Sequence, residues 1–288
     1  MTDIKNIETD VEPVAPKKPA GALFWISVGF LAVLVLAAIF AKYIGLKDPL
    51  YQDYNTVGAG PSAAHWFGTD DLGRDIFSRV IYGSRVSLVV SSLSMAIGFG
   101  LGTPLAMLAA YRRGRFDAVL TALMYSILAF PAIIANIAIL SFWTPRSLTK
   151  VIIVVGLAST PLIYRVVRTA TLAIGTKEYV MAAKVQGASD SRIMFRELLP
   201  NVFPIVLSFL IIGIASVVVL EGSLAFLGLS VLPPTPSWGN MINEGRNSLQ
   251  QSPSLVLFPS MMMCLFLLSI NFVGERLRSR LDVSEVKL

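Results

Sequence analysis

The chain has 288 residues, of which 55% are hydrophobic and 15% are charged, whereas soluble domains have roughly 25% charged residues. The apolar residues occur in blocks of about 20, the length that an α-helix needs to cross a bilayer. This composition excludes an ordinary water-soluble globular protein. The single cysteine, Cys264, lies within one of these blocks, so the sequence excludes a disulfide framework within the chain.

Six apolar blocks are long enough to cross a membrane as helices. They are residues 22–41, 86–110, 118–142, 151–167, 202–220 and 255–273. Prolines lie inside four of the blocks and near the start of another, which predicts kinked helices. We therefore predict an all-α integral membrane protein with six transmembrane helices.

The transmembrane domain is expected to cover residues 21–281. The preceding residues, 1–20, are polar, contain proline and mix both charges, which is typical of a disordered tail. Residues 282–288 are expected to form a second, shorter tail. The first apolar block is too long for the apolar region of a signal peptide and is interpreted as a membrane anchor.

The basic residues predict the orientation of the chain. If both tails are cytoplasmic, 16 of the 24 lysine and arginine residues lie on the cytoplasmic side, which the positive-inside rule favours. Topology and contact with anionic membrane lipid then explain the net charge of +6. No basic face remains for nucleic acid once these residues are distributed among loops.

The first long segment outside the blocks, residues 42–85, contains an amphipathic pattern. Apolar residues between Leu72 and Ile81 fall on one half of a helical wheel, and charged residues between Asp71 and Arg79 fall on the other. This pattern predicts an interfacial amphipathic helix on the outer side. Thr69 or Asp70 is expected to cap its N-terminus.

The same segment admits a sharper interpretation. His65 with Asp70, Asp71 and Asp75 would form a metal site or an acid–base set. Helix capping, together with pairing of Asp75 with Arg79, explains the acidic residues more simply. We therefore assign no catalytic residue and no metal ligand.

The second long segment, residues 168–200, is predicted to be a cytoplasmic helix–turn–helix. Thr176 is expected to cap the first helix, and Gly187 forms the turn. Ser189 or Asp190 is expected to cap the second helix, which Pro200 would limit. The segment is either an ordinary solvated loop or a docking element.

The third long segment, residues 221–254, begins as an apolar run that glycines and a proline cluster interrupt. Such backbone persists at membrane depth only where protein or a watery cavity covers it. We predict that the segment folds back onto the bundle. Glu221, at its start, is either a functional group near the hydrocarbon or an interfacial residue that reaches water.

Several motifs are absent. The sequence contains no G-x-x-x-x-G-K-[ST] loop, so we predict that the chain does not bind ATP through a P-loop, needs no cofactor of its own and is not an enzyme. Ser94, Gly98 and Gly102 recur every four residues, which favours a packing stripe between helices over a nucleotide site. Few charges lie within the spans, which argues against a proton-coupled carrier.

The block E-Y-V-M-A-A-K-V-Q-G at 178–187, followed by R-E-L-L-P-N at 196–201, resembles the EAA loop of ABC-transporter membrane subunits. Met181 stands where the EAA loop has its glutamate, and Glu178 lies three residues upstream. The positions that the resemblance assigns to ATPase coupling are Glu178, Ala182, Ala183, Gly187, Leu199 and Pro200.

Three more stretches, at 65–79, 125–131 and 220–239, resemble the C-type permease subunit of the dipeptide/oligopeptide/nickel importer family. Glu197 and Val283 depart from the family's pattern. The residues that we assign to the translocation path or outer gate are Phe130, Pro131, Glu221, Phe226 and Leu227.

The resemblance implies a multi-pass subunit of a bacterial inner membrane that forms half of a path for peptides. It implies a second homologous permease, two ATPase subunits or domains that bind ATP and Mg, and an extracytoplasmic substrate-binding protein as partners. Import of nickel chelate or another small solute is the alternative within the family. A stand-alone channel or secondary carrier is the alternative from another class, and an intramembrane enzyme is disfavoured because no catalytic motif occurs.

Overall fold

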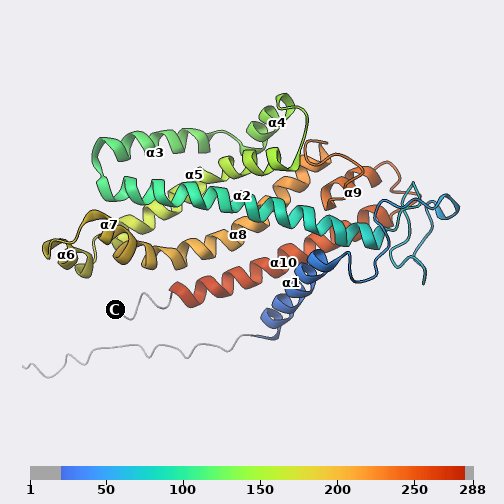
Figure 1. Cartoon of the computed structure of the whole chain (residues 1–288), viewed down its shortest axis with the longest axis horizontal. Coiled ribbons are helices and arrows are strands. Elements are labelled where there is room, and N and C mark those ends of the chain that lie inside the picture. Colours follow the sequence, from blue (N-terminus) through green and yellow to red (C-terminus); the bar gives the residue numbers. More distant parts are fainter. Residues whose placement is uncertain (1–20, 283–288) are drawn as a thin grey trace, which may run out of the picture.

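The computed structural model describes residues 21–282. These form an elongated helical bundle, and the part that is described contains no strand, only an isolated bridge between Thr69 and Asp75. The predicted tail at 1–20 lies outside the described residues, as does the predicted tail at 282–288 except for Asp282, which ends α10. Figure 1 shows α2, α5, α8 and α10 running along the long axis, with α6 and α7 at one end and α9 at the other.

The α-helices are α1 (Ala22–Phe40), α2 (Ile76–Arg112), α3 (Gly114–Ala129), α4 (Ala132–Phe142), α5 (Leu148–Ile174), α6 (Glu178–Val185), α7 (Asp190–Arg192), α8 (Leu199–Phe226), α9 (Trp238–Gly245) and α10 (Ser254–Asp282). A short 3-10 helix, η1 (Tyr54–Thr56), precedes α2, and a π-helical turn, η2 (Ile193–Leu198), joins α7 to α8.

Five helical stretches are long and apolar enough to cross a membrane, and α3 with α4 makes a sixth if this bent pair is one span. The prediction of six membrane-spanning segments is met when the bent pair of α3 and α4 is counted as one span. The third block is not one kinked helix, because its two helices meet at 84°. Pro131 precedes α4 and Phe130 is extended, since a residue before proline avoids the helical conformation.

The predicted interfacial amphipathic helix is wrong as a separate element. Its residues belong to the loop before α2 and to the first turns of α2 itself, which continues without a break to Arg112. Asp75, and not Thr69 or Asp70, caps the helix by accepting a hydrogen bond from the Ser78 amide. Arg79 is 0% exposed, so the polar face packs against protein instead of lying on a membrane surface.

Close contact between α2 and α5 confirms the predicted packing stripe. A Cβ atom at Gly102 would lie 2.9 Å from the Thr160 carbonyl oxygen, and one at Gly156 would lie 2.8 Å from Cβ of Ile97. The hydroxyl of Ser94 donates to the Ile152 carbonyl oxygen at 3.1 Å. Small residues therefore let the two backbones approach each other, as they do in membrane helices generally.

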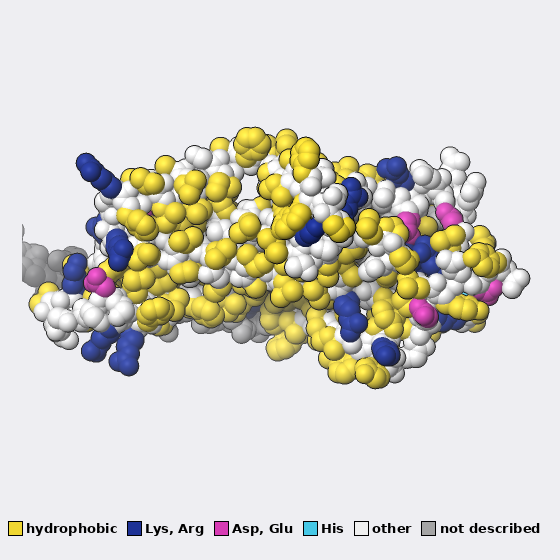
Figure 2. Space-filling model, turned by 45° about the horizontal axis from the view of Figure 1, so that its top comes forward, with side chains coloured by type: hydrophobic (Ala, Val, Ile, Leu, Met, Phe, Trp, Pro, Cys, Tyr) yellow, Lys and Arg dark blue, Asp and Glu magenta, His cyan; other side chains and the backbone are white. Residues whose placement is uncertain are grey.

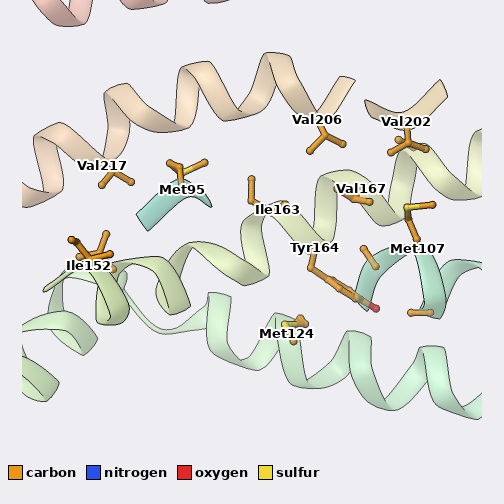
Figure 3. Packing of buried hydrophobic residues seen from close by; sticks show 14 of the residues in the cluster. Met95, Met107, Met124, Ile152, Ile163, Tyr164, Val167, Val202, Val206 and Val217 are labelled. Atoms are coloured by element: carbon orange, nitrogen blue, oxygen red, sulfur yellow. The ribbon is translucent and has the colours of Figure 1, made fainter. Parts of the chain in front are cut away.

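The hydrophobic core surrounds α5. Figure 3 shows α5 between α8 and α3, with Tyr164 pointing from α5 toward the side on which α3 lies. Tyr164 is fully buried, and its hydroxyl is 2.8 Å from that of Thr121. The outer surface is apolar as well: Trp25 is 64% exposed, and Figure 2 shows apolar side chains along most of one face. A bilayer is the solvent that suits such a surface.

The glycine contact between α2 and α5 can be tested with a matched pair of substitutions. Gly102→Leu forces a side chain into the Thr160 backbone, whereas Gly100→Leu on the same helix meets no atom within 4 Å of its Cβ. We expect Gly102→Leu to lower the free energy of unfolding by about 1–3 kcal/mol, the usual cost of overpacking. Gly100→Leu should unfold like wild type in a thermal assay of the purified protein. Equal stability of the two variants would contradict the close-packed interface.

The orientation can be tested by labelling single cysteines in a Cys264→Ser background. Gln186 and Gln250 are both exposed and are expected on opposite sides of the membrane. A membrane-impermeant maleimide should label Gln250→Cys in intact cells, and Gln186→Cys only after the membrane is permeabilised. The reverse pattern would show that the topology is inverted.

Candidate functional site

The predicted helix–turn–helix is present, but the first cap and the extent of the second helix differ from the prediction. Thr176 does not cap α6, because its hydroxyl donates to the Ala173 carbonyl oxygen. Ser189 does cap α7, accepting from the Arg192 amide. The second helix does not stop at Pro200, since one continuous helical stretch runs from Asp190 to Phe226. Pro200 lies in α8 directly after the π-helical turn η2, where the backbone hydrogen bonds already depart from the α-helical pattern.

One face of α6 is exposed and largely apolar. Its residues follow the i, i+3, i+4, i+7 spacing of a single helical face. Together with the turn glycine, they form what we call the docking surface: Glu178, Met181, Ala182, Val185 and Gly187. Met181 is 54% and Val185 is 88% exposed. The sequence analysis did not assign Met181 or Val185 to the docking surface. Their helical spacing from Glu178 and Ala182 would have placed them on the same face.

The other face of α6 anchors it to the bundle. Val180 is 5% exposed and belongs to the main hydrophobic core. Ala183 is only partly exposed, so it lies at the edge of the docking surface. Leu199 packs against the core, and Pro200 is exposed in the first turn of α8. The predicted coupling residues therefore divide into exposed positions and positions that support them.

Gly187 has the conformation expected of a turn glycine. Its φ angle is +79°, and a Cβ atom there would meet nothing within 4 Å. The Gly187 amide donates to the Lys184 carbonyl oxygen and closes the end of α6. Glycine is thus needed here for its left-handed backbone, and the open space around it leaves room for a partner.

Glu221 is buried within the chain. Helix α8 continues past it to Phe226, and its side chain is 0% exposed. Its carboxyl oxygens accept hydrogen bonds from the Ser87 hydroxyl of α2 at 3.1 Å and from the Ser230 hydroxyl at 2.7 Å. The interpretation in which Glu221 reaches water at the interface is therefore wrong. Glu221 instead joins α2, α8 and the segment that follows α8.

The segment after α8 folds back onto the bundle as predicted. Trp238, the first residue of α9, is fully buried, and its indole nitrogen donates to the Val80 carbonyl oxygen at 3.1 Å. Asn240 donates to the Val231 carbonyl oxygen at 2.7 Å. A Cβ atom at Gly239 would lie 2.7 Å from the Gly222 carbonyl oxygen. Only glycine fits where α9 crosses α8.

The remaining residues assigned to the path lie in two places. Phe226 is 40% and Leu227 is 52% exposed, and both line an apolar pocket of about 330 Å³ formed with Gly222, Gly239 and Met263, among others. Phe130 and Pro131 are exposed at the break between α3 and α4 and do not line this pocket. The structure of the single chain thus does not bring all five residues together.

A cluster of charges, most of them buried, at the end of the bundle that carries α9 was not predicted. Arg74 Nε lies 2.6 Å from Asp70 Oδ2, and both Arg74 and Arg79 contact Glu244 Oε2, at 3.0 and 2.8 Å. This charge cluster joins the loop before α2 to α9. Glu244 is 165 residues from Arg79, so no local sequence pattern reveals the pairing.

The alternative metal site does not form. Among residues 21–282, no group of three or more potential His, Cys, Asp or Glu ligands is placed to hold a metal ion. His65 Nδ1 is instead 2.8 Å from Asp75 Oδ1, the residue that caps α2. His65 and Asp75 therefore brace the loop before α2.

The sequence is similar to those of known transport proteins. Residues 102–283 match the family described as binding-protein-dependent transport system inner membrane component. The glutathione transport system permease protein GsiD of Pectobacterium atrosepticum is 37% identical over 254 residues, covering 88% of this chain and 84% of that protein. The dipeptide transport system permease protein DppC of Alkalihalophilus pseudofirmus is 36% identical over 259 residues, with the same shares.

Solved structures share the fold. An inward-facing structure of the MetNI methionine ABC transporter matches with a TM-score of 0.60 at 19% identity, covering 70% of this chain and 96% of the other. An amino acid ABC transporter matches with a TM-score of 0.55 at 12% identity, covering 71% and 94%. At these low sequence identities, the similarity shows only that the fold is shared.

The buried position of Glu221 predicts a measurable effect on stability. Glu221→Ala leaves the hydroxyls of Ser87 and Ser230 without their shared acceptor, which should lower the free energy of unfolding by about 1–3 kcal/mol. Glu221→Gln keeps a side-chain oxygen and should lose less. Thermal unfolding of the purified protein checks this order. An alanine variant as stable as wild type would contradict the bracing role of Glu221.

Proposed function

The chain belongs to the family of binding-protein-dependent transport system inner membrane components, and from this membership we propose that it forms half of the peptide path of an ATP-driven importer. It is a membrane-spanning permease subunit of the ABC-importer class. The observation that carries the proposal is the docking surface: exposed apolar side chains on a short helix outside the spans. An exposed apolar patch of this kind is typical of an interaction site.

The proposed partners follow from the missing P-loop and from the exposed docking surface on α6. Its sequence has no P-loop, so ATP and Mg would be bound by two ATPase subunits or domains that dock on the α6 face. A second homologous permease would enclose the path, and an extracytoplasmic binding protein would deliver the substrate. The chain would lie in a bacterial inner membrane with both termini in the cytoplasm.

The proposed mechanism is a two-state change driven by differential binding. Closure of the ATPase pair on ATP would move the docking surface. Helix α8 is continuous with α7 and η2, so this movement would reach the outer half of the bundle without a flexible joint. The outer segment, with Phe226 and Leu227 at its start, would then form part of the outer gate.

Peptides are the substrate class that the relatives support, because glutathione and dipeptides appear in the names of two similar permeases. Nickel chelates and other small solutes are the alternative substrates within the dipeptide/oligopeptide/nickel importer family that the sequence resembles. A stand-alone channel or secondary carrier would need no partner at α6 and gives no account of the exposed Val185 and Met181.

Reconstitution of the complete complex tests the function. We expect uptake of radiolabelled dipeptide or glutathione into vesicles only when ATP, the ATPase subunits and the binding protein are all present. The chain purified alone should hydrolyse no ATP. Uptake by this chain without nucleotide, or ATP turnover by the isolated chain, would contradict the proposed division of labour.

Gly187 tests the docking surface, and Gly45 provides a matched control. Both have positive φ angles, and both have open space where a Cβ would lie; Gly45 follows α1, outside the docking surface. Leucine at either position strains the backbone by a similar amount, but only Gly187→Leu obstructs docking. We expect Gly187→Leu to reduce ATPase recovery in pull-downs and abolish uptake, and Gly45→Leu to retain both. Normal ATPase recovery and uptake with Gly187→Leu would contradict the docking role.

A further inference from the structure

The segment from α6 to α7, which carries the docking surface and which we call the docking loop, is tied to the end of α2 by a hydrogen bond. The Tyr111 hydroxyl donates to Asp190 Oδ1 at 2.6 Å. Tyr111 lies in the last turn of α2, and Asp190 is the first residue of α7, three positions after Gly187. Figure 1 shows the α2–α3 turn and α7 at the same end of the bundle. This bond adds to the covalent connections of the docking loop to α5 and α8 and to the burial of Val180 in the core.

The two ends of this bond differ in rigidity. The Tyr111 ring packs against the main hydrophobic core, whereas Asp190 is exposed and follows directly after Ser189, the cap of α7. A hydrogen bond to a charged acceptor is stronger than one between neutral groups. Because the bond joins an exposed loop to a core-packed helix end, displacement of the loop acts on the end of α2.

Helix α2 cannot move far without α5. The Gly102 and Gly156 contacts leave no free space between the two backbones, and close-packed interiors transmit strain instead of absorbing it. At the same end, Arg168 of α5 binds both carboxyl oxygens of Asp117 at 2.7 and 2.6 Å, which joins α3 to α5. The α2–α5 pair and the start of α3 therefore form one unit.

We infer that Tyr111 and Asp190 are positioning residues that couple movement of the docking surface to the α2–α5 pair. This inference rests on the proposed function, in which ATPase subunits dock on α6. ATP-driven movement then reaches the bundle through the continuous helix to α8, through the chain that connects α6 to α5, and through the Tyr111–Asp190 bond to α2. Loss of this bond leaves docking and ATP hydrolysis intact but lowers the efficiency with which they drive transport.

The test uses the complete transporter reconstituted in vesicles, with substrate transported per ATP hydrolysed as the readout. Tyr111→Phe removes only the hydroxyl, and Asp190→Ala removes the acceptor. Each should lower this ratio by at least about fivefold, the lower range of coupling between sites, with unchanged abundance and ATPase recovery. The double variant should be no worse than either single variant, because both remove one interaction.

Two controls separate coupling from local structure. Asp190→Asn keeps a side-chain acceptor and should restore most of the ratio that Asp190→Ala loses. Tyr43→Phe makes the same chemical change at an 80% exposed tyrosine after α1 and should behave as wild type.

Wild-type ratios in both Tyr111→Phe and Asp190→Ala would overturn the inference while leaving the proposed function standing. A loss that is explained entirely by lower ATPase recovery would also overturn it, because the bond would then only brace the loop. Absence of ATP-driven uptake by the wild-type complex would overturn the proposed function and this inference with it.

Discussion

The close contact between α2 and α5 is the constraint on which the rest of the bundle depends. Lipid tails are as apolar as leucine side chains, so membrane helices associate through close packing and not through the hydrophobic effect. Gly98, Gly102 and Gly156 bring the two backbones together, and the core around α5 forms against this pair. The helices at the edge, such as α1 with its exposed Trp25 and Val33, contribute mainly apolar surface.

Two sets of polar contacts hold the end of the bundle that carries α9 against the α2–α5 pair. Glu221 accepts hydrogen bonds from α2 and from the segment after α8, and the charge cluster joins Arg74 and Arg79 to Glu244 of α9. Buried charges cost free energy unless they are paired, and here each arginine meets a carboxylate. The segment after α8 is therefore fixed by specific partners.

Hydropathy predicted the spans well because their length and composition are properties of continuous sequence. The Gly98–Gly102 stripe and the turn at Gly187 were also predictable, since spacing and residue type carry that information locally. The amphipathic pattern at the start of α2 led to the wrong prediction of a helix at the membrane surface. Its polar face is buried because Arg79 pairs with Glu244, which is far away in the chain. The burial of Glu221 was hidden for the same reason: its partners, Ser87 and Ser230, come from two other segments. The break at Phe130 was predicted as a kink, but sequence gives no angle.

Because the glycine contact leaves no space between their backbones, we expect α2 and α5 to move as one unit when the proposed importer changes state. Pulsed electron paramagnetic resonance between spin labels at Leu101 of α2 and Leu157 of α5, both exposed, measures this directly in the assembled complex. We expect the same Leu101–Leu157 distance distribution with and without ATP. A second label pair, at Leu101 and at Gln186 in the docking loop, serves as the comparison. A nucleotide-dependent change in the Leu101–Leu157 distance would contradict movement of α2 and α5 as one unit, because it would mean that the glycine contact opens during transport.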